Sequence, residues 1–279
     1  MTTFDLVHYV ERFPRDDEKI QATDRWVGAG GPAANAAIAF ASLGGNPTLL
    51  TAIGTGTLSV AARDDLSALG VRVVDLAEGG SLPTSSIIVD DSGRRTVVSL
   101  NARGFDESEM SNRTPDFEDP DVVVVDSHFP NVVKEVLSRI GASETPVVFD
   151  PGGYKDHVYD LMRECDHVIA SCSLAPNLPS SQLLERLLSH GPRLAAVSVG
   201  SSPTVASIDG QAIELRVPQT DAIDTMGAGD VLHGAYAYGI SNGAPLQRAL
   251  EDATAIASQS CATHGPRPGG SLGMSTDIA

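Results

Sequence analysis

The sequence predicts an α/β fold in which a mainly parallel sheet carries helices on both faces. Short apolar strands alternate with helices from residue 121 to residue 199. Strands that are apolar along their whole length are typical of a sheet buried on both faces. A glycine-rich loop at 224–230 then runs into an apolar helix, a junction typical of the ligand-binding edge of such sheets. The length of 279 residues fits one domain, which we assign to residues 1–279.

The composition narrows the class of protein. The chain has 42% hydrophobic and 20% charged residues, which are globular values. Its net charge of −17 argues against nucleic acid or an anionic membrane as a partner, because both are polyanions. The three cysteines and the scattered histidines have no metal-ligand spacing, so we expect no protein metal site and a cytoplasmic location.

The first hundred residues predict two β-hairpins, the first of them lying off the main body. Residues 4–13 and 19–27 read as a hairpin, and residues 85–89 and 95–100 form a second one around the turn at Asp90–Gly93. Between them we expect a strand at 47–53, a helix at 57–69 and a strand at 71–76.

The remainder of the chain predicts the central sheet. The expected strands are 121–126, 146–150, 166–170 and 194–199, the expected helices are 131–140, 154–163, 182–188 and 245–263, and a hairpin joins 204–208 to 212–217. Asp126, Asp150 and Gly200 come at strand ends, where ligands bind in such sheets. Either aspartate could instead cap a helix.

The stretch 224–237 carries the strongest chemical pattern. Gly227 and Gly229 allow a tight turn, and the backbone N–H groups of Gly227, Ala228 and Gly229 would form an anion hole at a helix N-terminus. Asp230 follows in the first helical turn, where a carboxylate beside a phosphate can act as a general base. The alternative is an ordinary glycine turn with Asp230 as a helix cap.

A second glycine-rich stretch lies at 28–35. The pattern Gly28-x-Gly30-x-x-Ala33 has the form of a dinucleotide-binding fingerprint. The preceding strand is polar, however, and no acidic residue lies about 20 positions further on to hold a ribose. A dinucleotide site is therefore disfavoured.

The string Asp224-Thr-Met-Gly-Ala-Gly-Asp230 resembles the C-terminal signature of the ribokinase (PfkB) family of carbohydrate kinases. The sequences Gly-Gly-Pro-Ala-Ala and Asp-Val-Leu-His-Gly-Ala are most similar to its ketohexokinase and sulfofructose kinase branch. The resemblance implies a ribokinase-like three-layer sandwich in which the strands from about 6–27 and 84–101 form a β-sheet lid over the sugar. It also implies phosphorylation of a small sugar, with ATP and Mg²⁺ and with room for a monovalent cation such as K⁺.

The resemblance assigns roles to individual residues. It implies substrate binding by these five: Asp5, Gly30, Gly31, Asn35 and Arg95. It implies nucleotide binding by these four: Gly200, Thr225, Gly227 and Gly229. Without the resemblance, Asp5 would read as a solvated acid, Asn35 as a polar residue early in a helix, and Arg95 as a charge that protects an edge strand.

The chain also departs from the family pattern. It has no paired acids in the turn at 54–57, no Asn-x-x-Glu after the strand at 166–170, and only the first glycine of a Gly-Ser-x-Gly at Gly200. Relatives have a full buried strand before the position of Asp5. We therefore expect that this chain begins late and that its central sheet lacks that strand. Arg267 could reach a phosphate, but we expect it to be solvated.

Three functions remain open on the sequence. The first is a sugar kinase with Asp230 as base, acting on an unsulfonated keto- or aldo-sugar because His128 stands where a sulfonate binder would want Arg. The second is a nucleoside kinase of the same family, for which the lid would offer Tyr9, Trp26 and Phe105. The third is a non-catalytic sugar-binding relative. The resemblance further implies a homodimer through the lid. His233 is expected to pack against its helix.

Overall fold

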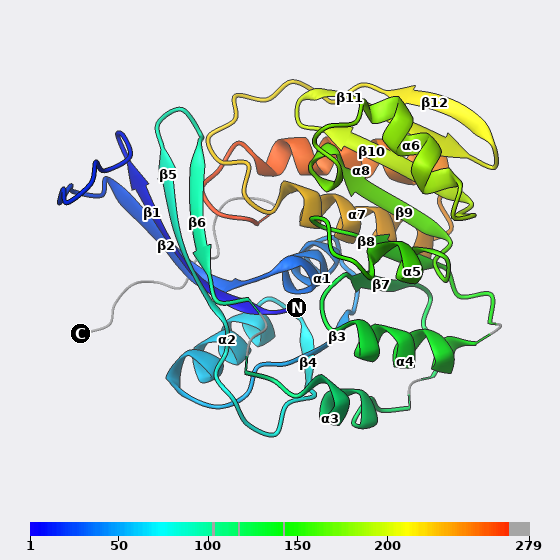
Figure 1. Cartoon of the computed structure of the whole chain (residues 1–279), viewed down its shortest axis with the longest axis horizontal. Helices are drawn as coiled ribbons and strands as arrows, with labels where there is room; N and C mark the ends of the chain where they lie inside the picture. The colour runs from blue at the N-terminus through cyan, green and yellow to red at the C-terminus, as the bar shows by residue number, and fades with distance from the viewer. Residues whose placement is uncertain (102–103, 117, 142, 268–279) are drawn as a thin grey trace.

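The computed structural model describes residues 1–101, 104–116, 118–141 and 143–267. Figure 1 shows a body of sheet and helices with a separate sheet of long strands on one side. The predicted lid and the predicted α/β body are both present.

The core of the body is a six-stranded sheet. Its strand order is β12-β11-β10-β9-β8-β7. The strands are β7 (Val123–Asp126), β8 (Val147–Asp150), β9 (His167–Ser171), β10 (Leu194–Val199), β11 (Ser202–Ile208) and β12 (Gln211–Leu215). Strands β7 to β10 run parallel, whereas β11 and β12 add antiparallel to the edge. The carboxyl ends of four strands therefore lie along one edge, as the apolar runs predict.

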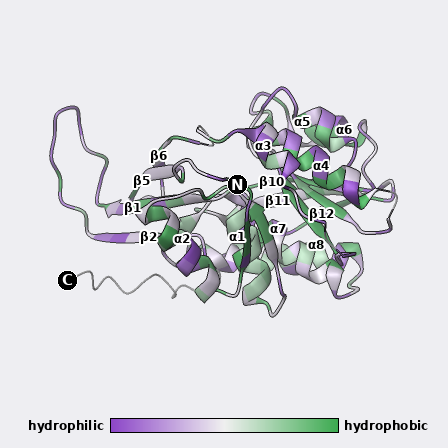
Figure 2. Ribbon diagram, turned by 90° about the horizontal axis from the view of Figure 1, so that it is seen from below, coloured by the Kyte–Doolittle hydropathy of each residue, from purple (hydrophilic) through white to green (hydrophobic). Residues whose placement is uncertain are grey.

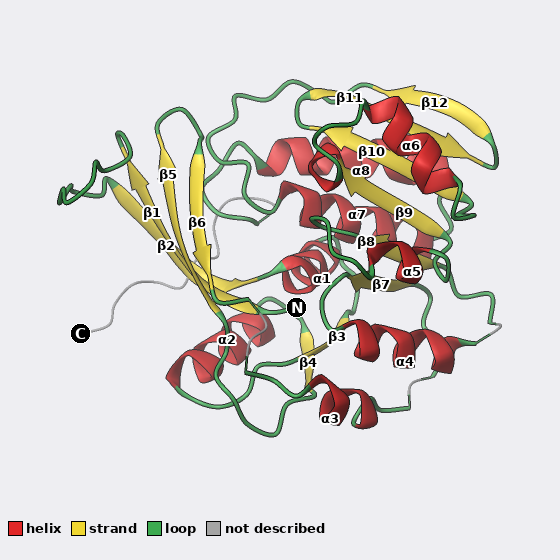
Figure 3. Cartoon of the chain, in the orientation of Figure 1, coloured by secondary structure: helices red, strands yellow, loops and turns green. Residues whose placement is uncertain are grey.

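Helices cover this sheet on both faces, as Figure 3 shows. Val147 and Phe149 of β8 pack on one face, whereas Val148 between them packs on the other. This alternation explains why the strands are apolar throughout. The first face is covered by α4 (Pro130–Ile140), α5 (Val158–Met162) and α6 (Ser180–Leu188), with the 3₁₀ turn η1 (Cys172–Leu174) beside them. The second is covered by α7 (Ala228–Ser241) and α8 (Leu246–Ser260), with α1 (Pro32–Ser42) packed on α7.

The lid is a four-stranded sheet with the order β2-β1-β5-β6. Its strands are β1 (Thr3–Val10), β2 (Asp24–Gly30), β5 (Thr84–Asp90) and β6 (Arg95–Ser99). Both predicted hairpins are present, and they join through a parallel pairing of β1 with β5. The second strand begins at Asp24 rather than at residue 19, and Figure 2 shows the hydrophilic loop that occupies the difference.

A third, two-stranded sheet pairs β3 (Thr48–Thr51) with β4 (Arg72–Asp75). Within the described ranges, no strand-to-strand hydrogen bonding joins it to either of the other sheets. Helix α2 (Thr57–Ala68) packs beside β2 and β4, and α3 (Glu107–Asn112) packs beside α4. Among the described residues, no helix is both long enough and apolar enough to cross a membrane.

Candidate active site

The N-terminus of α7 forms the centre of the candidate site. Gly227 precedes the helix with a φ of 71°, a left-handed conformation that favours glycine. Within the described part of the chain, the backbone N–H groups of Gly227, Gly229 and Asp230 donate to no protein acceptor, whereas that of Ala228 donates to the carbonyl of Thr225 at 3.4 Å. The unpaired donors lie at the positive end of the helix dipole, an arrangement suited to a phosphate.

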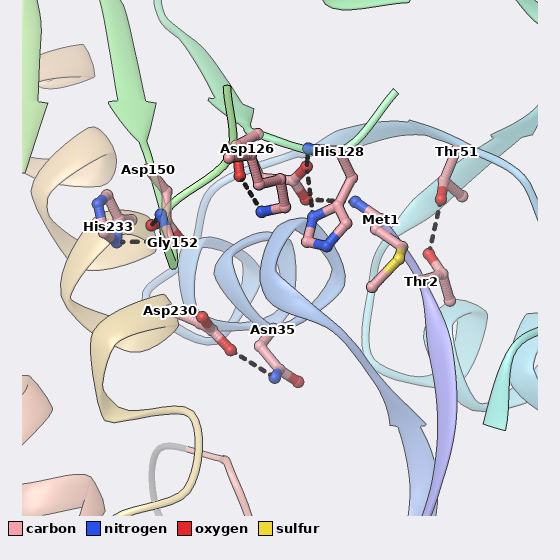
Figure 4. Close-up of polar contacts among 12 residues, drawn as sticks. Met1, Thr2, Asn35, Thr51, Asp126, His128, Asp150, Gly152, Asp230 and His233 are labelled. Carbon is pink, nitrogen blue, oxygen red and sulfur yellow. Dashed lines mark hydrogen bonds and ion pairs between the residues drawn. The ribbon is translucent and has the colours of Figure 1, made fainter. Parts of the chain in front are cut away.

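Asp230 faces Asn35 across the site. The Asn35 side chain donates from Nδ2 to Asp230 Oδ2 at 2.7 Å, and Figure 4 shows the two residues reaching toward each other from α1 and α7. Asn35 is only 4% exposed, yet its Oδ1 atom has no partner among the described residues. A buried acceptor without a donor is costly, so this oxygen is suited to a ligand hydroxyl.

The carboxylate of Asp230 lies in an unfavourable electrostatic environment. Burial raises its pKa, and the nearby carboxylates of Asp150 and Asp126 raise it further, to about 7. The hydrogen bond from Asn35 and the charge of His233 act in the opposite direction. A carboxyl group with a pKa near neutrality can exchange a proton during a reaction, which is what a general base requires.

Asp126 and Asp150 do not cap helices. Asp126 Oδ1 accepts the backbone N–H of His128 at 2.7 Å, and Asp150 Oδ1 accepts that of Gly152 at 2.8 Å. Both bonds close short turns directly after β7 and β8. The two acids therefore lie at the ligand-binding edge of the sheet, on the same side as Asp230 (Figure 4).

Asp5 lies inside β1 rather than at a solvated strand start. It is 6% exposed, accepts a 2.7 Å hydrogen bond from Thr3 Oγ1, and has a pKa raised by burial. A Cβ atom at residue 30 would lie 2.0 Å from Asp5 Oδ2. Gly30 is therefore needed to admit this carboxylate, and Gly31, with a φ of 93°, turns the chain into α1.

Arg95 joins the lid to the glycine-rich loop. Its Nη1 atom donates to Thr225 Oγ1 at 3.1 Å. Gly200 takes a φ of 55° in the turn between β10 and β11, beyond the carboxyl end of β10. The predicted nucleotide residues Thr225 and Gly200 thus lie in two loops that follow the same edge of the sheet.

The sequence did not reveal the support beneath the glycine-rich loop. Asp224 accepts hydrogen bonds from Tyr9 Oη at 2.7 Å, from Met226 N at 2.9 Å and from Gly265 N at 3.1 Å. The ring of His264 stacks on Tyr9 with centroids 3.8 Å apart. The lid, the loop and the turn after α8 therefore share one set of contacts.

The expectation that Arg267 is solvated is wrong. Its side chain is 5% exposed and forms two hydrogen bonds with Asp65 of α2, at 3.2 and 2.5 Å. Its guanidinium also lies 5.1 Å from the ring centre of Trp26. Because Arg267 forms this buried ion pair, its guanidinium is unsuited to hold a phosphate. Residues 268–270 of the predicted turn lie outside the described residues.

The fold and the site define a phosphotransferase of the ribokinase-like α/β class. The model of the pfkB family carbohydrate kinases matches residues 1–271. The chain therefore belongs to the pfkB family of carbohydrate kinases.

Individual relatives agree with this assignment. The chain is 23% identical to a ribokinase of Bacillus subtilis, covering 96% of this chain and 92% of that protein. It is 27% identical to an ATP-dependent ribose-1-phosphate kinase of Halopiger xanaduensis, covering 95% and 90%. It is 23% identical to a ketohexokinase of Mus musculus, covering 95% of each. The ketohexokinase branch thus stands beside ribokinases among these relatives, and the assignment to that branch stays a prediction.

Solved structures agree on the fold. A ribokinase from Thermotoga maritima superposes with a TM-score of 0.75 at 21% identity, covering 95% of this chain and 91% of that one. An Arabidopsis thaliana ribokinase complexed with ribose and ATP gives a TM-score of 0.73 at 20% identity, covering 95% and 91%. The ribokinase-like fold predicted from the sequence is confirmed.

Proposed function

We propose that this kinase transfers the γ-phosphoryl group of ATP to a hydroxyl group of a small sugar, with Asp230 as general base. The pair of Asn35 and Asp230 carries the proposal. Asn35 holds the carboxylate with its amide N–H and leaves its carbonyl oxygen free. A sugar presents neighbouring hydroxyl groups, so one can donate to Asn35 while another gives its proton to Asp230.

The glycine-rich loop at 224–230, called the anion loop from here on, supports the same reaction. Negative charge spreads over the transferred phosphoryl oxygens, and preorganised N–H groups stabilise it. Two free N–H groups supply such donors. One belongs to Gly229, directly before Asp230, and the other to Gly227, two residues earlier in the turn. Asp5, Gly30, Gly31 and Arg95 remain our proposed sugar-binding residues, and Gly200 and Thr225 our proposed nucleotide-binding residues.

Mg²⁺ would shield the charge of the ATP phosphates when bound with them. Among the described residues, no group of three or more His, Cys, Asp or Glu side chains is arranged to hold a metal ion. The described side chains therefore form no cage of their own for Mg²⁺.

The two alternatives receive less support. A nucleoside kinase would need lid aromatics that can stack on a base, but Tyr9 is occupied by His264 and Asp224, and Trp26 lies against Arg267. A non-catalytic sugar binder would not need a carboxyl group with a pKa near 7 beside free backbone donors.

A substrate screen with one variant as comparator tests the proposal. ADP release would be measured with ribose, ribose 1-phosphate, fructose and adenosine as acceptors. We expect turnover with at least one sugar and none above background for Asp230→Asn at the same protein concentration. A preference for adenosine, or equal turnover by the variant, would contradict the proposal.

We also propose a cytoplasmic location, where ATP is supplied.

We further propose a homodimer through the exposed face of the lid. Leu6 and Val98 both lie in register with Ser86, so they share one face of the lid, and they are 36% and 70% exposed. Such apolar exposure is reduced when two copies pair. Val98→Glu should shift the mass measured by light scattering from dimer to monomer; a wild-type monomer would end this idea.

A further inference from the structure

The geometry points to a buried imidazolium at His233 that favours the ionised form of Asp230. This inference rests on the proposed function, because it explains how the base stays available. His233 does not touch the reacting atoms in this arrangement. It is a positioning residue that acts through Asp230 and through the backbone of the anion loop.

The hydrogen-bond partners of His233 carry the inference. The side chain is 5% exposed on α7. Its Nδ1 atom lies 2.7 Å from the carbonyl oxygen of Gly229, and its Nε2 atom lies 2.8 Å from that of Ile169. A carbonyl oxygen only accepts, whereas a neutral imidazole has one N–H group and one bare nitrogen. Both contacts are hydrogen bonds only when both ring nitrogens carry protons.

The Ile169 carbonyl lies next to the point where one strand pairing ends. The pairing of β8 with β9 ends at Phe149 and Val168, one residue before Ile169. The chain of β8 then turns away at Asp150, whose carboxylate closes the turn to Gly152. Ile169 stays in register with Ala196 of β10, and the Nε2–H group of His233 donates to its carbonyl oxygen at 2.8 Å.

The charges around His233 favour the doubly protonated ring. Asp150 Oδ2 from β8 lies 3.8 Å from Nδ1, Asp230 lies on the same helix, and Asp126 ends β7. Two cations oppose them: Lys155, in the segment after β8, interacts with Asp126 and Asp150, and the Met1 ammonium forms a buried ion pair with Asp126. Three carboxylates against these two cations leave room for a further positive charge on the ring.

The imidazolium has two consequences for catalysis. Its charge opposes the effect of burial and of Asp150 on Asp230, so it lowers the cost of ionising the base. Its Nδ1–H group also holds the carbonyl of Gly229, whose own N–H group belongs to the anion loop. One side chain thereby couples the base to the loop.

His167 provides a matched control in the same core. It is 3% exposed, and its Nδ1 atom lies 3.1 Å from Oη of Tyr236, a residue of the same helix as His233. A hydroxyl group can donate to a bare nitrogen, so this contact requires no second proton. Burial lowers the pKa of His167 to about 4, which makes it a neutral buried histidine.

The first experiment observes the protons directly. Long-range ¹H–¹⁵N correlation spectra of ¹⁵N-histidine-labelled protein at pH 7.5, assigned with His233→Gln and His167→Gln, report the state of each ring. We expect two protonated nitrogens for His233 and one for His167. A bare nitrogen on His233 under these conditions would overturn the inference, and this result needs neither substrate nor turnover.

The second experiment measures the effect on Asp230. In His233→Gln, the acidic limb of kcat/KM should move up by about one pH unit, because an opposite charge near a carboxylate is removed. The loss should be about tenfold at pH 6.5 and small at pH 9. In His167→Gln the limb should keep its position. A folded His233→Gln enzyme with an unmoved acidic limb would overturn the proposed coupling.

A carboxyl ¹³C titration of Asp230 in both variants separates the two proposals. If Asp230 titrates at higher pH in His233→Gln while no sugar is phosphorylated, the inference holds and the proposed function fails. If sugars are phosphorylated but the titration is unchanged, the function holds and the inference fails.

Discussion

The molecule contains two buried acidic centres that differ in how their carboxylates are satisfied. At the junction of lid and body, Asp65 accepts hydrogen bonds from both Nη atoms of Arg267. It also accepts one from the backbone N–H group of Ala29, at 2.8 Å. At the sheet edge, Asp230 receives one amide hydrogen bond and faces two other carboxylates. Asp65 thus has a cation and three hydrogen bonds, whereas Asp230 has one hydrogen bond and no cation bonded to it among the described residues.

The difference separates a structural acid from a reactive one. A carboxylate that is paired with a cation is stabilised as an anion, and most of its hydrogen-bonding capacity is used by protein donors. An undersupplied carboxylate is held at a cost that a ligand or a proton can relieve. The contrast therefore assigns stability to the Asp65 centre and chemistry to the Asp230 centre, and each can be tested separately.

Asp230→Asn should give the largest effect on activity. It keeps the shape and the contact with Asn35 but removes the base, so kcat should fall about 10²–10⁴-fold. ATP affinity should stay equal or become slightly tighter, because a negative charge beside the phosphates is lost. Single-turnover kinetics and ATP titration measure the two effects. Near-wild-type kcat would break the assignment of chemistry to this centre.

Arg267→Met should give the largest effect on stability. Removing one partner of a buried ion pair leaves the other charge uncompensated, which typically costs about 3–5 kcal/mol. Urea unfolding measures the loss. The matched control is Arg267→Met combined with Asp65→Asn, which removes the orphaned charge and keeps an acceptor for Ala29. The double variant should recover much of the stability; a double variant as unstable as the single one would show that the charge is not the cause.

The pH dependence of stability should also distinguish the centres. The folded state raises the pKa of Asp230 from 3.8 to about 7, so the folded state binds this proton more tightly than the unfolded state. Stability from this group is present below about pH 4 and is lost as pH rises through about 7. The loss is on the order of 2–4 kcal/mol. Unfolding of wild type and Asp230→Asn from pH 5 to pH 8 should therefore diverge, with the variant relatively more stable at high pH. Parallel curves would contradict the shift.

Two glycines of the anion loop should respond differently to the same change. Gly227 has a φ of 71°, and a Cβ there would lie 2.3 Å from Cβ of Pro266, so Gly227→Ala should cost about 1–3 kcal/mol of stability. Gly229 is helical, and a Cβ there meets no atom within 4 Å. Gly229→Ala should keep or slightly raise stability while weakening nucleotide binding, because the added methyl group enters open space beside the N–H donors. Melting temperatures with and without ATP compare them; equal destabilisation would be the contrary result.

The fold could be predicted because burial leaves a pattern in the chain. Strands covered on both faces are apolar throughout, and the two hairpins carry their own turn residues. The parallel pairing of β1 with β5 has no such local pattern, since Phe4 and Thr84 meet only when the hairpins join. Strand β2 begins later than predicted because residues 19–23, although they alternate, lie largely exposed and have no core to face.

The site was predictable in its parts but not in its contacts. The motif resemblance indicates Asn35 and Asp230, but no local feature of the sequence shows that residues 195 positions apart share a hydrogen bond. The prediction for Arg267 is wrong because its partner lies 202 positions away. One clue was present: Asp65 falls in the stripe of α2 that also carries Ala62 and Leu66, where an acid needs a partner. His233 is likewise a polar residue among buried apolar positions of α7, so it too needs a partner.

The turn after α8 has a consequence for how the enzyme is made. Gly265 bonds Asp224, Pro266 packs against Gly227, and Arg267 pairs with Asp65. Translation delivers these residues after every other member of the site. A nascent chain can therefore form its lid and its sheet while the anion loop still lacks its support. We therefore expect a chain that stops before Gly265 to fold its sheets but to lack kinase activity.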